Sequence, residues 1–463
     1  MPTKFISFLG FGTYSACSYF FENEQEEPYV TRFVQVSLIR HLVLSGQLSP
    51  DDEILFLVTD AAKSKNYLNN QDEIGNIIIG LEGELARLEK TVLKPGKFRL
   101  PKIKTIGIPE GKSENELWQI FNTLVDNVND SDRVFYDITH SFRSLPTLAL
   151  VVLNYLRIVK KITIEKIFYG AYEAKSKAVD IEHAPIFDLT PFVDLMEWTT
   201  AADHFIRTGN TLLLSELTKK EIQPILSLSR GKNEKANILN KLSKSLEKFG
   251  KDLFIVNGPK ISKDIYQLND NIQNSKESVS EIPPLAYLFE KIQKPFETAQ
   301  VPESIVENTN IVIRFCFNHG LIQQGFTLLD ENLITYGCLK NGLDHIQPKF
   351  RELYSSVFGL KEKPESQWQL RDRVNQKTKK VSFSKEEQLE AVKKIMSSDS
   401  ELDILAKLRK QISQLRNALN HATFNASGVE YDVYIEKGNS LLTEFEKMIS
   451  AKKDNSKVGV YEQ

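Results

Sequence analysis

Three polar residues near the C-terminus, Arg416, Asn417 and His421, have the types and spacing that RNA cleavage without a metal ion would need. They close an apolar-periodic stretch over residues 402–419 that predicts a helix, and a spacing of four puts Asn417 and His421 on one helical face. Histidine can take the proton of a ribose 2′-hydroxyl or protonate the leaving 5′-oxygen, and arginine can stabilise the phosphorane charge. A helix that ends in Arg, Asn and His could equally do no more than compensate the helix dipole.

A glycine-containing turn follows the first apolar stretch of the chain. Gly10 and Gly12 let backbone amides approach a phosphate. Thr13 and Ser15 add hydroxyl donors on either side of Tyr14. We expect these five residues to contact a ligand, although a tight strand-to-helix turn would have the same composition. The dinucleotide-binding pattern of three glycines is incomplete, because Ser15 stands at the third position, so the turn does not favour NAD.

A second polar turn, residues 137–143, leaves the fourth predicted strand and enters a helix. Asp137, Thr139 and His140 are expected to face a pocket together with Ser141 and Arg143. The guanidinium of Arg143 could hold a phosphate, and the hydroxyl of Thr139 or Ser141 could donate to it. A lone histidine in such a turn can also be only a structural hydrogen-bonding group.

The elements that must position these turns alternate between strand and helix. The expected strands cover residues 4–9, 53–59, 102–108, 133–138 and 162–172. The expected helices cover residues 31–44, 74–93, 113–128 and 145–159, the third opened by a capping box of Ser113 and Glu116. This alternation predicts an α/β, Rossmann-like parallel sheet with helices on both faces. Residues 178–189 are expected to add a hairpin strand, and the acidic stretch 20–27 to form a loop.

Beyond residue 190 the pattern becomes helical. Helices are expected over residues 192–214, 215–226 and 232–249, and again between residues 283 and 449, with long amphipathic stretches at 304–318, 323–339, 385–396 and 400–419. Residues 250–280 are polar and read as a connector. The predicted plan is a ligand-sensing domain (1–190), a helical connector (191–282), an all-α domain (283–451) and a mobile tail (452–463).

Composition excludes several classes of protein. The formal net charge is −2, which argues against a protein covered in positive charge. The three cysteines form neither a zinc-binding spacing nor a disulfide framework, so a reducing cytoplasm is expected and no metal site is predicted. We expect neither a signal peptide nor a membrane helix. The stretch 361–380, with seven basic residues and Trp368, could contact RNA or be a solvated loop.

The stretches LGFGTYS, DITHSFRSLP and RNALNH occur together on this predicted architecture. The combination resembles the CRISPR-associated CARF–HEPN ribonucleases of type III systems, in the branch known for a D-x-T-H-G motif. The stretch IQQGFTLLDENLI also resembles the helical domain of that branch. Ser141 stands where the motif has glycine, a departure that keeps the side chain small.

The resemblance implies a CARF-like sensor domain that binds cyclic oligoadenylate and a HEPN-like domain that cleaves single-stranded RNA in antiviral defence. It assigns Arg416, Asn417 and His421 to catalysis, and the two N-terminal turns to the cyclic activator. Cyclic tetra-adenylate is the expected activator, cyclic hexa-adenylate an alternative. A homodimer or higher homo-oligomer with a composite site is expected, with no catalytic cofactor, 2′,3′-cyclic phosphate products, and no membrane or stable DNA partner. The sensor domain could also cleave its activator.

Three other hypotheses remain from the sequence. The protein could be a ligand-responsive transcription regulator, although the C-terminal half has no compact helix-turn-helix pattern. The helical domain could be a non-catalytic interaction module. The α/β domain could be an ordinary nucleotide-dependent enzyme, which the missing Walker and dinucleotide motifs disfavour. A gel shift with promoter DNA, set against an RNA cleavage assay, would separate the first hypothesis from a ribonuclease.

Overall fold

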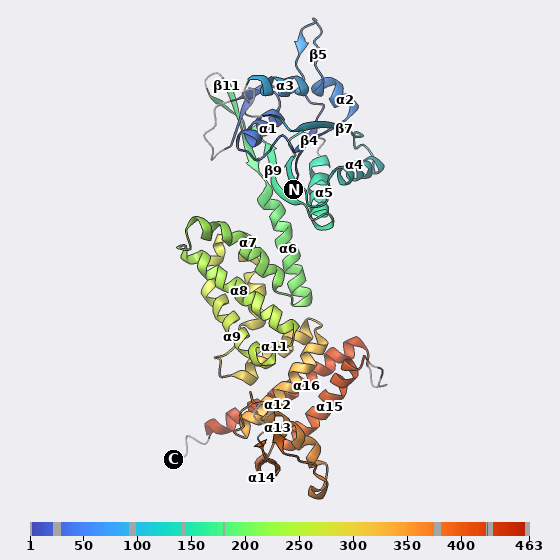
Figure 1. Ribbon diagram of the computed structural model, residues 1–463. Helices are drawn as coiled ribbons and strands as arrows, with labels where there is room; N and C mark the ends of the chain where they lie inside the picture. Colours follow the sequence, from blue (N-terminus) through green and yellow to red (C-terminus); the bar gives the residue numbers. More distant parts are fainter. Residues whose placement is uncertain are drawn as a thin grey trace. The chain divides into compact units, whose positions relative to one another are not determined.

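The computed structural model describes residues 2–21, 29–91, 99–140, 144–178, 181–374, 381–422, 424 and 429–458 (Figure 1). The chain divides into two compact units, Met1–Met196 and Glu197–Gln463. The N-terminal unit contains two hydrophobic clusters, one on each face of a sheet, and the C-terminal unit contains one large cluster.

A nine-stranded, mostly parallel sheet forms the centre of the N-terminal unit. Five of its strands are parallel to one another and lie in the spatial order β9 (Thr163–Gly170), β8 (Arg133–Asp137), β1 (Thr3–Leu9), β4 (Glu53–Val58) and β7 (Lys102–Gly107), with β7 at the edge of the sheet. Beyond β9 follow the antiparallel β11 (Ile181–Asp188), with β10 (Ser176–Ala178) paired to it, then β2 (Cys17–Phe21) and β3 (Val30–Thr31). All seven residues of β1 are buried, as expected for a parallel strand that is covered on both faces.

Helices cover both faces of this sheet (Figure 1). They are α1 (Val34–Leu44), α3 (Leu81–Thr91), α4 (Glu114–Asn127) and α5 (Ser144–Val159). Phe5 and Leu9 of β1 pack in the cluster that contains α1 and α3, whereas Ile6 and Phe8 pack in the cluster that contains α4 and α5. The alternation of neighbouring side chains between the two clusters confirms the predicted doubly wound α/β architecture.

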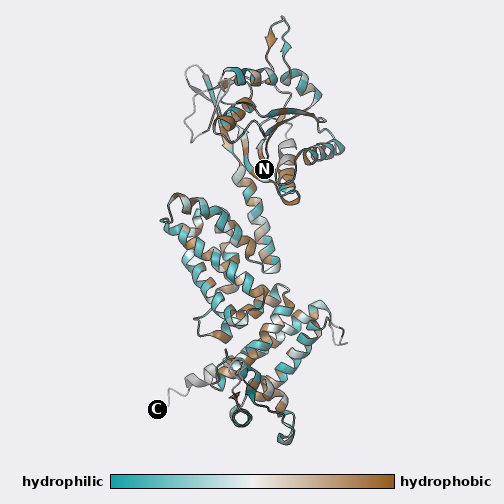
Figure 2. Ribbon diagram, in the orientation of Figure 1, coloured by the Kyte–Doolittle hydropathy of each residue, from teal (hydrophilic) through white to brown (hydrophobic). Residues whose placement is uncertain are grey.

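The C-terminal unit is helical and shares one hydrophobic cluster that extends from Trp198 to Ile449. Its helices are α6 (Thr190–Thr208, which begins in the N-terminal unit), α7 (Leu212–Leu228), α8 (Glu234–Phe254), α9 (Gly258–Ser275), α10 (Pro283–Gln293), α11 (Ile305–Asn318), α12 (Ile322–Lys340), α13 (Pro348–Lys361), α14 (Lys385–Ser398), α15 (Leu402–Asn420) and α16 (Tyr431–Val458). Hydrophilic and hydrophobic residues alternate along most of these helices (Figure 2), as amphipathic packing requires. A short hairpin of β12 (Arg373–Val374) and β13 (Val381–Phe383) is a departure from the predicted all-α region.

Two predicted elements of the N-terminal unit differ from the structure. The helix expected over residues 74–93 begins only at Leu81, because Asp72 accepts backbone hydrogen bonds from Ile74 (3.0 Å) and Asn76 (2.8 Å) and so forms the turn of a hairpin. This hairpin pairs β5 (Asn70–Gln71) with β6 (Ile77–Ile78). The stretch read as an acidic loop starts with the end of strand β2, which pairs with β11, and residues 22–28 lie outside the described part.

Three boundaries in the helical region also differ. The break predicted at 214/215 lies instead around Gly209, whose φ of +68° ends α6, and Leu212 starts α7. The segment 250–280 is not a connector: it contains α9, whose buried Ile261, Ile265, Leu268 and Ile272 form one helical stripe. Residues 452–458 continue α16 rather than starting a tail, and residues 459–463 lie outside the described part.

All three cysteines are buried thiols. Burial raises the pKa of Cys17 and of Cys316, and it raises the pKa of Cys338 to about 11. Cys17 belongs to the N-terminal unit, and the other two belong to the helical unit. Within the described residues, no helix combines the length and apolarity that crossing a membrane requires.

Candidate functional site

A cavity of about 350 Å³ opens where the parallel strands of the N-terminal unit end. Its lining comes from the ends of four neighbouring strands, β1, β4, β7 and β8, or from the residues directly after them. The lining residues are Phe8, Leu9, Gly10, Phe11, Gly12, Tyr14, Thr59, Ile108, Thr139 and His140. This carboxyl edge is the position at which doubly wound sheets bind ligands.

The structure brings both predicted turns to this cavity. Five predicted ligand residues line it, namely Gly10, Gly12, Tyr14, Thr139 and His140. Thr13 and Ser15 belong to the same loop but are not part of the lining, and Asp137 is buried beneath it. Ser141 and Arg143 lie outside the described residues.

Two aromatic rings in tilted contact line the cavity. The rings of Tyr14 and His140 lie 4.3 Å apart between centroids, and Tyr14 also packs edge-on against Phe33 at 5.6 Å. A β-carbon on Gly10 would lie 2.9 Å from Tyr14 Oη, closer than normal packing permits. A side chain at position 10 would therefore force the Tyr14 hydroxyl to move.

His140 is an uncharged polar group at neutral pH. Burial lowers the pKa of its imidazole from 6.5 to about 4. Among the described residues, no hydrogen-bond partner reaches its Nε2 atom. The ring can thus offer a donor or an acceptor, but no positive charge, to a bound molecule.

This depressed pKa predicts that stability falls on acidification. In the unfolded chain His140 binds a proton below about pH 6.5, whereas in the folded chain it does so only near pH 4. Protons therefore favour the unfolded state between these values, and stability rises with pH across this window. We expect the free energy of unfolding to fall by about 2–3 kcal/mol more in the wild type than in His140→Gln between pH 7 and pH 4.5. Urea titrations of both proteins at each pH measure the free energy of unfolding. If this free energy changed with pH equally in the two proteins, the prediction would be contradicted.

Asp137 holds the β8 turn in place. Its carboxylate accepts hydrogen bonds from Ser7 Oγ (2.7 Å), Thr139 N (3.0 Å) and Thr139 Oγ1 (2.5 Å). Thr139 Oγ1 in turn accepts a hydrogen bond from Gly170 N at 2.8 Å. Burial raises the pKa of Asp137, and the hydrogen bonds from Thr139 and Ser7 counteract that rise. Asp137 and Thr139 thus tie the ends of β1, β8 and β9 together.

Sequence reasoning missed the segment after β4. There α2 (Asp60–Ala62) leads directly into the π-helical turn η1 (Lys63–Tyr67). Asn66 Nδ2 donates to the carbonyl oxygens of Gly10 (2.8 Å) and Gly12 (2.9 Å), so it fixes the glycine turn. Lys65 Nζ lies 4.3 Å from the centroid of the exposed Phe11 ring at the cavity rim. The only signal for this segment in the sequence is its place directly after β4. The residues that follow a parallel strand lie at the same edge of the sheet as the two polar turns.

The second candidate site lies at the C-terminal end of α15. His421 is the residue that caps the helix, and its backbone N donates to Asn417 O at 2.9 Å. Both Asn417 and His421 are exposed, so their side chains can meet a substrate. Asn420 accepts a hydrogen bond from Gln323 of α12 at 3.2 Å, which joins the end of α15 to the neighbouring helix.

Arg416 is held by a buried carboxylate on α12. Its Nη1 atom lies 2.5 Å from Oδ2 of Asp330, which is 1% exposed. Oδ1 of Asp330 accepts a hydrogen bond from Arg409 Nε at 3.1 Å. The Arg416 side chain remains 27% exposed, so its guanidinium is both anchored and accessible. The arrangement provides an anchored cation and an exposed imidazole near one helix end.

The basic stretch 361–380 has fewer unpaired charges than its composition implies. Lys361 forms an ion pair with Asp403, and Arg373 pairs with Glu352. Trp368 Nε1 donates to two carbonyl oxygens, those of Leu360 (2.9 Å) and Lys363 (3.0 Å). These contacts favour a structural role for Trp368; residues 375–380 lie outside the described part.

A ligand-sized cavity at the carboxyl edge of a doubly wound sheet defines a Rossmann-like ligand-binding domain. Residues 4–175 match the family described as CRISPR system endoribonuclease Csx1, CARF domain. Residues 194–303 match a second family, described as CRISPR-associated protein MJ1674, second domain. The chain is therefore a CRISPR-associated protein that contains a CARF domain.

One curated relative matches part of this chain. The CRISPR-associated protein MJ1674 of Methanocaldococcus jannaschii is 29% identical over 167 residues. The alignment covers 35% of this chain and 25% of that protein. The chain thus matches about a quarter of the relative's length, and α15 with its polar end lies beyond the residues that the two families cover.

Proposed function

We propose that this protein is an endoribonuclease of CRISPR antiviral defence that a cyclic oligoadenylate activates through the CARF domain. The observation that carries the catalytic part is the exposed His421 beside Arg416, whose guanidinium the buried Asp330 anchors. A Csx1-type CARF domain supports both the ligand class and the nuclease class.

The proposed reaction uses only side chains of this region. A histidine removes the proton of the ribose 2′-hydroxyl, whose oxygen then attacks the adjacent phosphorus. The guanidinium of Arg416 stabilises the additional negative charge on the phosphorane oxygens. A second proton donor delivers a proton to the 5′-oxygen as the P–O bond breaks, which leaves a 2′,3′-cyclic phosphate and a 5′-hydroxyl. Asn417 shares the exposed face and orients the phosphate.

A dimer supports this chemistry better than one chain. One helix end supplies a single histidine, whereas the reaction needs a base and an acid. The sheet-edge cavity, at about 350 Å³, is at the low end of sites for drug-sized molecules, and a ring of four nucleotides is larger than that. Two copies around a two-fold axis would provide two cavities for a two-fold ligand and two histidines for one reaction.

The test of this function uses fluorescent single-stranded RNA, a panel of cyclic oligoadenylates of three to six nucleotides, and EDTA throughout. We expect one ring size to accelerate cleavage, and we expect cyclic tetra-adenylate to be that ring. The products should carry 2′,3′-cyclic phosphate. A matched DNA oligonucleotide without 2′-hydroxyls should remain intact. If RNA stays uncut with every ring, or if cutting requires added magnesium, the proposal is wrong.

Lys65 gives a specific prediction for the sensor site. Its ammonium group lies over Phe11 at the cavity rim, where it can pair with a phosphate of the ligand. Loss of a charge-assisted contact costs about 1.5–3 kcal/mol, so Lys65→Glu should raise the activator concentration for half-maximal cleavage about tenfold or more. The plateau at saturating activator should stay unchanged. The control is Lys90→Glu on the exposed side of α3, with the same change of charge. Equal midpoints for the two variants would exclude Lys65 from the site.

A further inference from the structure

A second and larger cavity, of about 500 Å³, lies within the helical unit. It is formed by the start of α9 and the residue Val256 before it, the segment that leads into the start of α11, one side of α12, the segment between α12 and α13, and Arg351 of α13. None of its lining residues belongs to α15, so it is distinct from the proposed cleavage site. Its volume lies in the range that proteins use to bind small molecules.

One part of the lining is apolar. Its members are short aliphatic or proline side chains, which offer smooth surfaces to a flat ring. They are Val256, Pro259, Pro302, Ile305, Leu328 and Ile346. Burying a planar ring against such surfaces removes apolar area from water on both partners, and this is the main favourable term in small-molecule binding.

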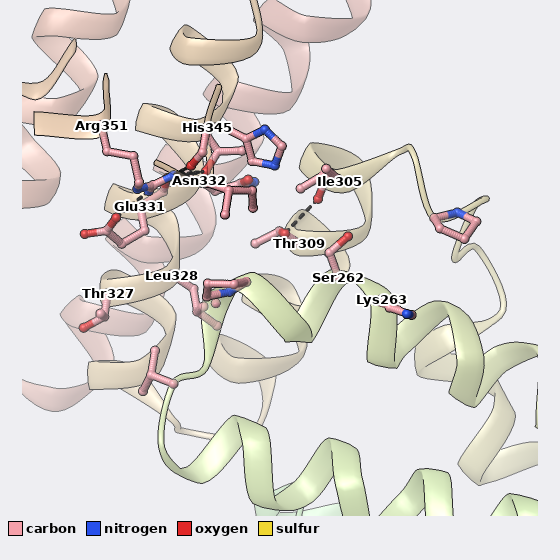
Figure 3. A pocket seen from close by; sticks show the side chains of 16 residues that line it. Ser262, Lys263, Ile305, Thr309, Thr327, Leu328, Glu331, Asn332, His345 and Arg351 are labelled. Carbon is pink, nitrogen blue, oxygen red and sulfur yellow. Dashed lines mark hydrogen bonds and ion pairs between the residues drawn. The ribbon is translucent and has the colours of Figure 1, made fainter. Parts of the chain in front are cut away.

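A cationic group is fixed on one side of the cavity. Arg351 donates from Nη1 to Thr335 Oγ1 (2.9 Å), and from Nη2 to Glu331 O (2.9 Å) and Oε2 (2.5 Å). Lys263 of α9 lies on the opposite side, as Figure 3 shows. Among the described residues, no carboxylate forms an ion pair with Lys263. Two cations and one carboxylate therefore line the cavity, which favours an anionic ligand.

Buried hydrogen-bonding groups lie between these two sides. Asn332 is 2% exposed, and its Nδ2 donates to Val306 O (3.0 Å) and to Asn310 Oδ1 (2.8 Å), so the orientation of its amide is fixed. Ser262 is 4% exposed, and its hydroxyl has no partner among the described residues. His345 also lines the cavity beside Asn332 (Figure 3). A purely hydrocarbon ligand would leave the Ser262 hydroxyl without a partner, which costs binding free energy.

We propose that this cavity binds a single nucleotide unit, with the base against the apolar lining residues and the phosphate at Lys263. A base supplies apolar faces together with polar edges, and its phosphate supplies the negative charge. A fatty acid would leave the Ser262 hydroxyl unpaired, and a sugar phosphate would leave the apolar lining residues uncovered. The unit can come from a free nucleoside monophosphate or from an RNA strand, which have this chemistry in common.

The test is calorimetric titration of the full-length protein with AMP, GMP, CMP and UMP. We expect at least one monophosphate to bind, and its unphosphorylated nucleoside to bind at least about fivefold more weakly, because the phosphate contact at Lys263 is charge-assisted. Lys263→Met should lower the affinity by a similar factor. Thr327→Trp, which places a large ring in the cavity from a half-buried position of α12, should abolish binding. The control Lys260→Met removes an equal charge one turn earlier on α9 from a residue outside the lining.

A second titration separates the two sources. Short single-stranded RNA is titrated into the cleavage-deficient His421→Ala protein and into the same protein with Lys263→Met or Lys260→Met added. RNA that binds at least tenfold more tightly than the monophosphate, and loses affinity with Lys263→Met alone, identifies the strand as the source. The proposal is overturned if no monophosphate binds at millimolar concentration, or if Lys263→Met and Thr327→Trp leave affinity unchanged while thermal melts show both variants folded. Because the readout is binding, failure of this site would leave the proposed cleavage reaction untouched.

Discussion

His421→Ala is expected to reduce cyclic oligoadenylate-activated RNA cleavage by about 10²–10⁴-fold, the usual contribution of a positioned proton-transfer group. The side chain is exposed at the end of α15, so its truncation should leave the thermal midpoint nearly unchanged. The measurement is the initial cleavage rate at saturating activator, together with a melt of each protein. His204→Ala, an exposed histidine on α6, is the matched control.

A His421→Ala protein that cuts at a near-wild-type rate would show that the catalytic group lies elsewhere. Loss of cleavage together with loss of activator binding would instead indicate a folding defect. Titrating the activator into the same variant distinguishes these outcomes, because its affinity should not change when only the cleavage site is altered.

Asp330→Asn is expected to damage both stability and cleavage. The carboxylate is buried and pairs with two arginines, Arg409 and Arg416, and the loss of one partner of a buried pair costs about 3 kcal/mol. Without this anchor the guanidinium of Arg416 no longer has a fixed position, so the rate constant at saturating RNA should fall at least tenfold while KM changes little. Urea unfolding and a KM-against-kcat analysis measure the two effects.

The control for this change is Asp403→Asn, at the start of α15, the helix that carries Arg409 and Arg416. Asp403 pairs with Lys361, but its side chain is 85% exposed, and exposed pairs contribute about 0–1 kcal/mol. Asp403→Asn should therefore change neither the free energy of unfolding nor kcat noticeably. An Asp330→Asn protein with unchanged kcat would show that Arg416 does not depend on this contact for its position.

The inner strands and the helices that cover them follow from the sequence because their apolar patterns are strong and local. Each of the five parallel strands β1, β4, β7, β8 and β9 lies where its apolar stretch predicts it. The errors fall where tertiary pairing or composition dominates. Strand β2 pairs with β11, which lies more than 160 residues further along the chain, and the acidic residues after it mask its buried Cys17–Tyr19. The polar composition of residues 250–280 led to the prediction of a connector, although the apolar residues of α9 have helical spacing.

The site could be predicted only in part for a similar reason. The two turns at the sheet edge and the end of α15 carry recognisable residue types. The residues that position them do not: Asp330 is separated from Arg416 by 86 positions, and Asn66 from Gly10 by 56. Such contacts depend on how helices and strands pack together, which no local pattern encodes. The lysine above Phe11 was missed because a short lysine-rich turn usually indicates only a solvated surface.

The burial of all three thiols makes them reporters of local opening in each unit. Alkylation requires a thiolate in contact with solvent, and the protonated, buried sulfurs of Cys17, Cys316 and Cys338 offer neither in the folded state. Labelling at Cys17 therefore counts openings of the sheet-containing unit, whereas labelling at the other two counts openings of the helical unit. Mass spectrometry of the three peptides can thus follow the two units separately in one sample, with no engineered probe.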